Sequence, residues 1–396
     1  MKKVGIVSCY FQPNYGSMLQ AYATQMALDK LGYDNETICI DGFNGEIKKA
    51  KIKYFVKASL TSKILLTKMG RAKDTVVRKL SRNEYTQKTA IRNECFKTFS
   101  QKYFRLSDTY PSKAILGEEC QKNYSAVLVG SDQLWLPGNI AADYYTLNFV
   151  PESVNTIAYA TSFGQSSLPK DSSKLAKVFL QKIKHLSVRE ESGQKLIADL
   201  TGRKVPVVCD PTLLFTGKEW LSIQQKEPIE QGNYIFCYFL GTNPLHRNFV
   251  RKLKAETGCE VVILPHIDEY VKEDEECSDK QLYDVDPSAF LNLIRNAKYV
   301  CTDSFHCSVF SILYKRNFFT FRRFSDKNKQ STNSRLDTLF HITGITGRLV
   351  SGDEDITEVL SRKTDFETAH RKLAEIRQKS YDYLMNALKD NGDTDL

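Results

Sequence analysis

The chain of 396 residues is 41% apolar and 11% aromatic, a composition typical of a globular protein with room for two domains. Its longest apolar runs, such as SAVLVG and YIFCYFLG, have the length of strands and are too short for a membrane span, which needs roughly 20 apolar residues. The net charge of +9 favours an anionic partner, so its position along the chain matters.

The first forty residues predict a strand, a helix and a second strand. The strand KVGIVSCYF is followed by the loop QPNYGS, the helix MLQAYATQMALDKLG and the strand ETICID. In such a βαβ unit the loop after the first strand faces the ligand side of a doubly wound sheet. Asn14, Tyr15, Gly16 and Ser17 occupy this loop.

The excess positive charge lies in residues 46–82, which contain twelve Lys or Arg and only two acids, Glu46 and Asp74. The basic residues alternate with Ile, Tyr, Phe, Val and Leu at near-helical spacing, a pattern that suits a helix lying on an anionic membrane surface. A helical insertion with a solvated basic face explains the pattern at least as well. A nucleic-acid arm ranks third and is not expected, because no recognised nucleic-acid-binding motif accompanies the charge.

After this insertion, strands and helices alternate in two series, which predicts two parallel sheets. The first series contains SAVLVGSD, NTIAYATSFG, LSVREE and VPVVCDPTLLF, and the second contains YIFCYFLG, EVVILPH, KYVCTD and NFFTF. The polar, irregular stretch 216–233 separates them, and we place the domain boundary there.

The predicted fold class is therefore α/β, with two doubly wound Rossmann-like domains facing each other across a cleft. We expect an N-terminal domain over residues 1–220 with a basic helical insertion at about 45–110, and a C-terminal domain over residues 230–350. The amphipathic segment within 360–396 predicts a final helix that packs back on the domains.

The ten cysteines favour a reducing compartment. Half of them lie inside apolar, strand-like runs, and no CxxC pair or Cys/His cluster has zinc-ligand spacing. The apolar run at the start is cut short by QPN and no cleavage site follows, so we read no signal peptide. We expect a cytoplasmic protein with buried, reduced cysteines and no metal site.

Ligands of doubly wound sheets bind outside the carboxyl ends of the strands, so residues at predicted strand ends are the candidates for a site. No GxGxxG or GxxxxGK[ST] motif occurs, and neither a dinucleotide site nor a P-loop has sequence support. The candidates at four strand ends are Asn14, Tyr15 and Gly16; Gly130, Ser131, Asp132, Gln133 and Trp135; Arg189 and Glu190; and Asp303, Ser304 and His306.

Two of these side chains have the chemistry of an anion site. Arg189 can hold a carboxylate or phosphate with two parallel hydrogen bonds, although an ion pair with Glu190 is the simpler explanation of an arginine taken alone. His306 lies at the expected first turn of a helix, where free backbone NH groups favour an anion and an imidazole can exchange a proton near neutral pH. An incidental histidine beside a helix cap formed by Asp303 or Ser304 explains its position equally well.

Seven motifs, in this order, resemble those of the polysaccharide pyruvyl transferases. They extend over most of the chain and together form a specific signal: NYGSMLQAYATQMAL, VLVGSDQLW, IAYATSFG, SVREESGQKLIADLTG, VVCDPTLLF, KYVCTDSFHCSVFSILYKRNFFTF and STNSRLDTLFHITG. The resemblance implies a GT-B-like fold. It also implies transfer of the enolpyruvyl carbons of phosphoenolpyruvate onto a sugar as a cyclic ketal, with phosphoenolpyruvate as co-substrate and no cofactor.

By this resemblance Arg189 corresponds to the arginine thought to grip phosphoenolpyruvate, and His306 to the family's essential histidine. We expect His306 to act as acid and base, Asp303 to orient it, and Ser304 and Arg335 to help bind the anion. Cys307 stands where the family pattern leads us to expect glycine. Residues whose side chains suit a pyranose, or lie beside such side chains, are assigned to the acceptor: Asn14, Tyr15, Gly16, Gln20, Asp132, Gln133 and Trp135.

The acceptor implied by the resemblance is a sugar of a bacterial surface polysaccharide, such as an exopolysaccharide or capsule, or its lipid-linked precursor. A lipid-linked acceptor would give residues 46–82 a purpose, by holding the enzyme at the inner membrane face. Two alternatives stay open: a nucleotide-sugar-dependent glycosyltransferase of the same fold, and a non-catalytic glycan-binding relative.

Overall fold

The computed structural model of the chain describes residues 2–60, 83–323 and 333–389. Its first parallel sheet has the strand order β2-β1-β3-β4-β5. The strands are β1 (Lys3–Val7), β2 (Asn35–Thr37), β3 (Tyr124–Val129), β4 (Asn155–Thr161) and β5 (His185–Val188). Because all ladders are parallel, the strands end at one edge of the sheet.

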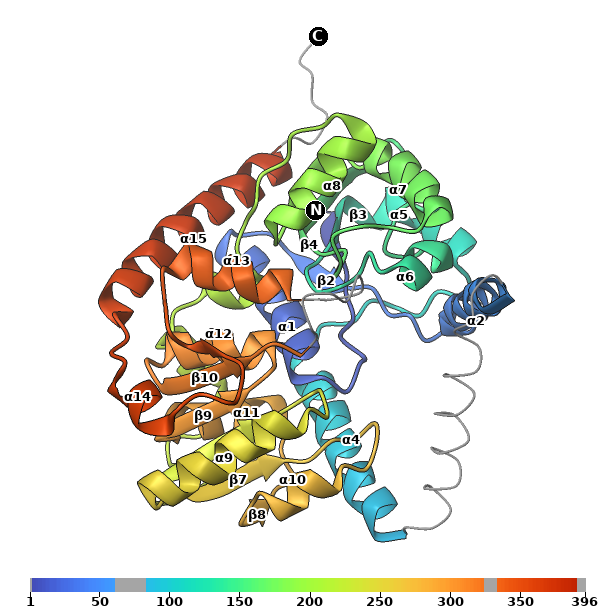
Figure 1. The fold of residues 1–396 in the computed structure, drawn as a ribbon. Helices are drawn as coiled ribbons and strands as arrows, with labels where there is room; N and C mark the ends of the chain where they lie inside the picture. Colours follow the sequence, from blue (N-terminus) through green and yellow to red (C-terminus); the bar gives the residue numbers. More distant parts are fainter. Residues whose placement is uncertain (1, 61–82, 324–332, 390–396) are drawn as a thin grey trace.

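The second sheet has the order β11-β10-β9-β6-β7-β8 and is also parallel. Its strands are β6 (Tyr234–Tyr238), β7 (Glu260–Leu264), β8 (Lys280–Gln281), β9 (Tyr299–Thr302), β10 (Asn317–Phe321) and β11 (Leu349–Val350). Figure 1 shows the two sheets in separate halves of the molecule with α1 between them, which confirms the expected α/β architecture.

Helices alternate with the strands in both halves. In the first half they are α1 (Tyr15–Lys30), α2 (Asn44–Leu60), α4 (Asn83–Tyr103), α5 (Lys113–Asn123), α6 (Pro137–Ala142), α7 (Lys170–Lys182) and α8 (Glu191–Thr201). In the second they are η1 (Pro211–Leu214), η2 (Glu219–Ile223), α9 (Pro244–Thr257), α10 (Lys272–Glu276), α11 (Pro287–Asn296), α12 (Phe305–Leu313), α13 (Ser334–Thr343), α14 (Ile356–Ser361) and α15 (Phe366–Lys389).

One expected strand is wrong. The run VPVVCDPTLLF forms a single bridge, between Val207 and Val188, and then a 3₁₀ helix over Pro211–Leu214. A proline has no NH to donate to a ladder and cannot extend a central strand, and this run contains Pro206 and Pro211. The chain therefore leaves the sheet after this bridge, and Asp210 lies at the turn into the 3₁₀ helix.

The two halves share a hydrophobic core through α1. Tyr15, at the start of this helix, stacks on Phe290 of α11 with ring centroids 4.4 Å apart and an angle of 6° between the planes. Its hydroxyl donates to the carbonyl of Val285 at 2.9 Å. Tyr15 is 1% exposed, so it is a packing residue between the halves, which corrects its assignment to an acceptor site.

The helix α4 also joins the halves. Arg92 on α4 is 1% exposed and donates to the carbonyls of Pro265, at 2.5 Å, and Leu282 in the second half. Its guanidinium lies 5.2 Å from the ring centroid of Tyr283. The segment expected as an insertion of the first domain therefore supports the second one, alongside which α4 runs in Figure 1.

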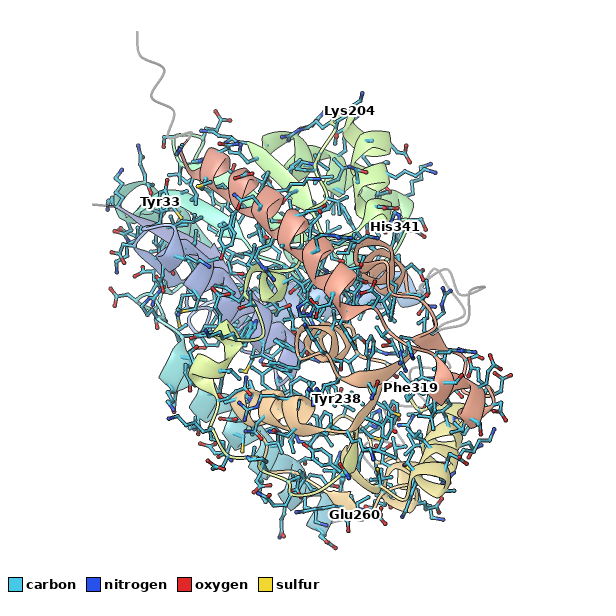
Figure 2. The ribbon with its side chains drawn as sticks, turned by 90° about the vertical axis from the view of Figure 1, so that its left-hand side faces the viewer. Tyr33, Lys204, Tyr238, Glu260, Phe319 and His341 are labelled. Carbon is cyan, nitrogen blue, oxygen red and sulfur yellow. The ribbon has the colours of Figure 1, made fainter. Side chains whose placement is uncertain are left out.

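The final helix α15 packs back across both halves. Ser380 accepts a hydrogen bond from the backbone NH of Cys209, and Tyr383 donates to the carbonyl of Ala158 in β4. Figure 2 shows this helix, in the red of the C-terminal end, running diagonally between the first half, marked by Lys204, and the second, marked by Tyr238 and Glu260. Within the ranges that the structure describes, no helix combines the length and apolar character needed to span a membrane.

Replacing Arg92 with methionine should lower the free energy of unfolding by about 2 to 4 kcal/mol, because two buried carbonyl groups lose a charged donor. Urea denaturation measures this change. The matched control is Arg251→Met on the exposed face of α9, which should change stability by less than about 0.5 kcal/mol. Equal effects of the two substitutions would show that α4 does not brace the second half.

Candidate active site

A pocket of about 330 Å³ lies between the carboxyl ends of the two sheets. Its walls come from both halves, and its side chains are mainly polar or charged. The first half contributes Asn14, Ser17, Lys51, Asp132, Gln133 and Asn139, and the second contributes Ser304, Phe305, His306, Arg323 and Arg335.

His306 is held at the first turn of α12 on the pocket wall. The Ser304 side chain caps this helix by accepting from the NH of Cys307 at 3.4 Å. A Cβ atom on Gly16 would lie 1.9 Å from Nδ1 of His306, so only glycine allows α1 to approach the imidazole this closely. Gly16 therefore shapes the site by its lack of a side chain.

The carboxylate beside His306 belongs to Asp210, a residue that sequence reasoning did not single out. Its Oδ2 atom lies 3.5 Å from Nε2 of His306 and accepts hydrogen bonds from Arg189 Nη1 at 2.6 Å and Ser131 Oγ at 3.0 Å. Its Oδ1 atom accepts from the NH and hydroxyl of Thr212. The sequence signal was an aspartate directly after the apolar run VPVVC, which we read as the interior of a strand.

Burial alone would raise the pKa of the Asp210 carboxyl, but His306 and Arg189 together hold this pKa well below its ordinary value. Asp210 therefore carries a negative charge at neutral pH although its side chain is 0% exposed. A buried charge of this kind fixes its partners in place.

Asp303 has a different role from the expected one. Its carboxylate accepts hydrogen bonds from the backbone NH groups of Leu240 at 2.7 Å and Gly241 at 2.9 Å. Its side chain thus closes the turn after β6. The expectation that Asp303 orients His306 is wrong, because Asp210 occupies that position.

Arg189 lies behind the pocket wall and is 4% exposed. Besides Asp210, its guanidinium lies 3.7 Å from Glu190 and 3.8 Å from Asp132, and it stacks 4.7 Å from the ring centroid of Phe305. Burial lowers the pKa of this arginine, but the three carboxylates outweigh burial and raise it. The position differs from the expected direct grip on an anion, because acids already surround the guanidinium.

Two other arginines reach the pocket directly. Arg335 is 8% exposed and lies 5.8 Å from the ring centroid of Phe305, on the pocket side. Burial, with the nearby charges of Arg189 and Arg323, lowers the pKa of Arg335 to about 10, so it remains a cation at neutral pH. Arg323 is half-buried and donates to the carbonyl of Asp303 at 3.2 Å. Arg323 directly follows the end of strand β10 (Asn317–Phe321), and this strand-end position is the sequence signal that identifies it.

The residues assigned to an acceptor separate into two groups. Asn14, Asp132 and Gln133 line the pocket, and the Asp132 carboxylate accepts from Ser17 Oγ at 2.6 Å. Gln20 and Trp135 are 0% exposed and belong to the core, where Trp135 donates to the carbonyl of Tyr145 at 3.0 Å. Their assignment to acceptor binding is therefore corrected.

Several polar nitrogens at the pocket are buried and have no hydrogen-bond acceptor among the described residues. They include Nε of Arg323 and Nε2 of Gln133, whereas Nε2 of His306 faces the Asp210 carboxylate at 3.5 Å. Buried donors in native proteins are normally satisfied, so these atoms are placed to meet an oxygen-rich or anionic ligand. No group of His, Cys, Asp and Glu suited to a metal ion occurs in the part of the chain that the structure describes.

The chain is similar to known proteins at two levels. A model of the family described as polysaccharide pyruvyl transferase matches residues 14–323. No curated protein sequence matches the chain.

Two solved structures share its overall fold. The UDP-N-acetylglucosamine 2-epimerase from Rickettsia bellii superposes with a TM-score of 0.51 at 10% identity, and the match covers 100% of this chain and 99% of that one. The UDP-GlcNAc 2-epimerase from Methanocaldococcus jannaschii gives a TM-score of 0.51 at 12% identity, with 96% and 100% covered. Both have the GT-B fold, which this chain therefore shares.

Replacing Arg189 with methionine should lower the free energy of unfolding by about 3 to 5 kcal/mol at neutral pH, because the buried carboxylates lose their cation. Without this cation the folded-state pKa of Asp210 should rise, although His306 still lowers it. The variant should then lose less stability than the wild type as the pH falls from about 7 to about 5, so the difference in unfolding free energy between the two proteins should narrow. Urea denaturation across this pH range measures the effect.

The control is Arg203→Met. Arg203 is half-buried and donates to the carbonyls of Leu180, Ile183 and Lys184, so its loss should cost stability without a change in pH dependence. A deficit at Arg189 that does not vary with pH would contradict the buried ionic cluster.

Proposed function

The chain belongs to the polysaccharide pyruvyl transferase family, and we propose that it transfers pyruvate from phosphoenolpyruvate onto a sugar as a cyclic ketal and releases phosphate. The observation that carries this proposal is the pairing of two pocket arginines with His306 at the start of a helix. Phosphoenolpyruvate has a carboxylate and a phosphate, and each needs fixed cationic or NH donors.

The donor side of the proposed site belongs to the second half of the chain. Arg323 and Arg335 would neutralise the two anionic groups, and the hydroxyl of Ser304 with the first NH groups of α12 would add hydrogen bonds. Arg189 would act through its partners, because it donates to Asp210 and stacks on Phe305, which Arg335 also contacts. The ligand's charge would relieve the repulsion between the clustered arginines.

Ketal formation requires proton transfers that one histidine can serve. Protonation of the methylene carbon makes the central carbon electrophilic, and a sugar hydroxyl adds to it and loses a proton. Phosphate then leaves, and a second hydroxyl adds to the central carbon, gives its proton to the departing phosphate and closes the ring. His306 would give the first proton and take one back, while the negative charge of Asp210 stabilises its protonated form.

The acceptor side would be the wall from the first half. Asn14, Asp132 and Gln133 offer amide and carboxylate groups that suit sugar hydroxyls, and Asn139 extends the same wall. The proposed acceptor is a sugar of a bacterial surface polysaccharide or its lipid-linked precursor, modified in the cytoplasm at the membrane's inner face. A nucleotide-sugar enzyme of the same fold is the main competing function.

Replacing Arg335 with alanine should weaken phosphoenolpyruvate binding by about 10- to 100-fold, since a charge-assisted contact with the ligand is lost. Calorimetric titration measures this affinity. Arg316→Ala is the control, because Arg316 is half-buried and lies outside the pocket. Stabilisation of the protein by uridine diphosphate, with no response to phosphoenolpyruvate, would support the nucleotide-sugar alternative instead.

Replacing His306 with glutamine should lower the rate of phosphate release from phosphoenolpyruvate by about 10²- to 10⁴-fold, with binding of phosphoenolpyruvate kept within a few-fold. A coupled phosphate assay with a saccharide acceptor measures the rate. The control is His246→Gln on α9, a buried histidine that does not line the pocket. Unchanged turnover of the His306 variant would remove its acid and base role.

A further inference from the structure

The helix α2 has two faces with different environments. Residues at helical spacing on its inner face are buried or half-buried, among them Ile47, Lys51 and Tyr54. This face packs on α6, because a Cβ atom on Gly138 would lie 3.7 Å from the ring of Tyr54. Lys51 continues past this contact and lines the pocket beside Asn139.

The outer face carries apolar side chains in solvent. Ile52 is 62% exposed and Val56 is 55% exposed, and they lie about one helical turn apart. Aliphatic side chains rarely gather on a helix in this way unless something covers them. Figure 1 shows α2 at the right-hand margin of the molecule, where an extended surface can reach it.

Lysines flank these apolar side chains. The helix contains five lysines, at positions 48, 49, 51, 53 and 57, and a single acid, Glu46. Lys49 and Lys53 share the outer face with Ile52 and Val56, since all four fall within two turns at three- and four-residue spacing. This combination fits the boundary between the headgroups and the acyl chains of an anionic bilayer. The apolar side chains would enter the acyl region, while each lysine places its apolar stem there and its charge at the lipid phosphates.

We propose that α2 is an interfacial helix that seats the pocket on an anionic lipid membrane. An α-helix with its side chains is about 10 Å across, so the wall formed by Lys51 would lie about that far from the headgroups. Burial lowers the pKa of Lys51, because it disfavours the charged ammonium group. An anionic ligand beside Lys51 would stabilise this positive charge. This second part of the inference rests on the proposed function: a saccharide linked to a lipid through phosphate would enter the pocket past Lys51.

Co-sedimentation of the full chain with vesicles tests the docking. The wild-type protein should bind phosphatidylcholine vesicles that contain phosphatidylglycerol and should not bind phosphatidylcholine alone. Ile52→Gln with Val56→Gln, and separately Lys49→Gln with Lys53→Gln, should each weaken binding by about tenfold. Unchanged thermal melting of both variants shows that the inner face of α2 still packs.

The matched controls lie on other elements. Leu221→Gln with Leu245→Gln removes two exposed aliphatic side chains from η2 and α9, and Lys252→Gln with Lys298→Gln removes two exposed lysines. Both should bind vesicles like the wild type. Absence of vesicle binding by the wild type would overturn the proposal. Full binding by the Ile52 and Val56 variant would also overturn it, because it would show that the contact is purely ionic and that no apolar side chain inserts into the bilayer.

Turnover separates this inference from the proposed function. Phosphate release from phosphoenolpyruvate with a lipid-free acceptor should be equal in the wild type and the Ile52 and Val56 variant, and only the rate with a vesicle-bound acceptor should fall. If the wild type and the variant turn over the lipid-free and the vesicle-bound acceptor at the same rates, membrane docking is overturned and the proposed function still stands. Absence of turnover with every acceptor, despite vesicle binding, would overturn the proposed function and leave the docking in place.

Discussion

The buried carboxylate of Asp210 is the constraint on which the candidate site depends. It accepts hydrogen bonds from Arg189 and Ser131 of the first half and faces His306 of the second. A buried ion has to keep its partners, since removing one typically costs about 3 to 5 kcal/mol. The pairing therefore fixes the histidine, the arginine and the two strand ends in one arrangement before any ligand arrives, which is the preorganisation that charge stabilisation in a reaction requires.

This arrangement also divides the positive charge of the site by function. The charge of Arg189 is balanced by Asp210, Asp132 and Glu190, so it contributes to structure. Arg335 and Arg323 face the pocket, where their mutual repulsion favours an anionic ligand. Phe305 contacts both groups, with Arg189 at 4.7 Å and Arg335 at 5.8 Å from its ring centroid. The aromatic ring is thus a shared neighbour of the arginine held by carboxylates and of an arginine that lines the pocket.

The sequence predicted the two-sheet α/β fold, and the rule that ligands meet strand ends found His306, Asn14, Asp132 and Gln133 at the pocket. The rule does not give side-chain direction, and so it wrongly assigned Tyr15 and Trp135, which turn into the core. Asp210 escaped because two prolines end the expected strand early. The role of α4 could not be predicted from the spacing of apolar residues, because this spacing does not reveal the hydrogen bonds of Arg92 with backbone carbonyls.

Cys307 is accommodated in the buried face of α12 at 0% exposure. Part of the basic segment, residues 61–82, and the tail beyond residue 389 lie outside the described residues.

The most direct test of the account is mass spectrometry of candidate lipid-linked saccharides after incubation with the enzyme and phosphoenolpyruvate. The account predicts that one saccharide gains the mass of pyruvate less water, that phosphate appears in equal amount, and that the gain disappears with the His306→Gln variant. Transfer of a hexose from a nucleotide sugar by the same pocket, with no gain from phosphoenolpyruvate on any saccharide, would contradict it.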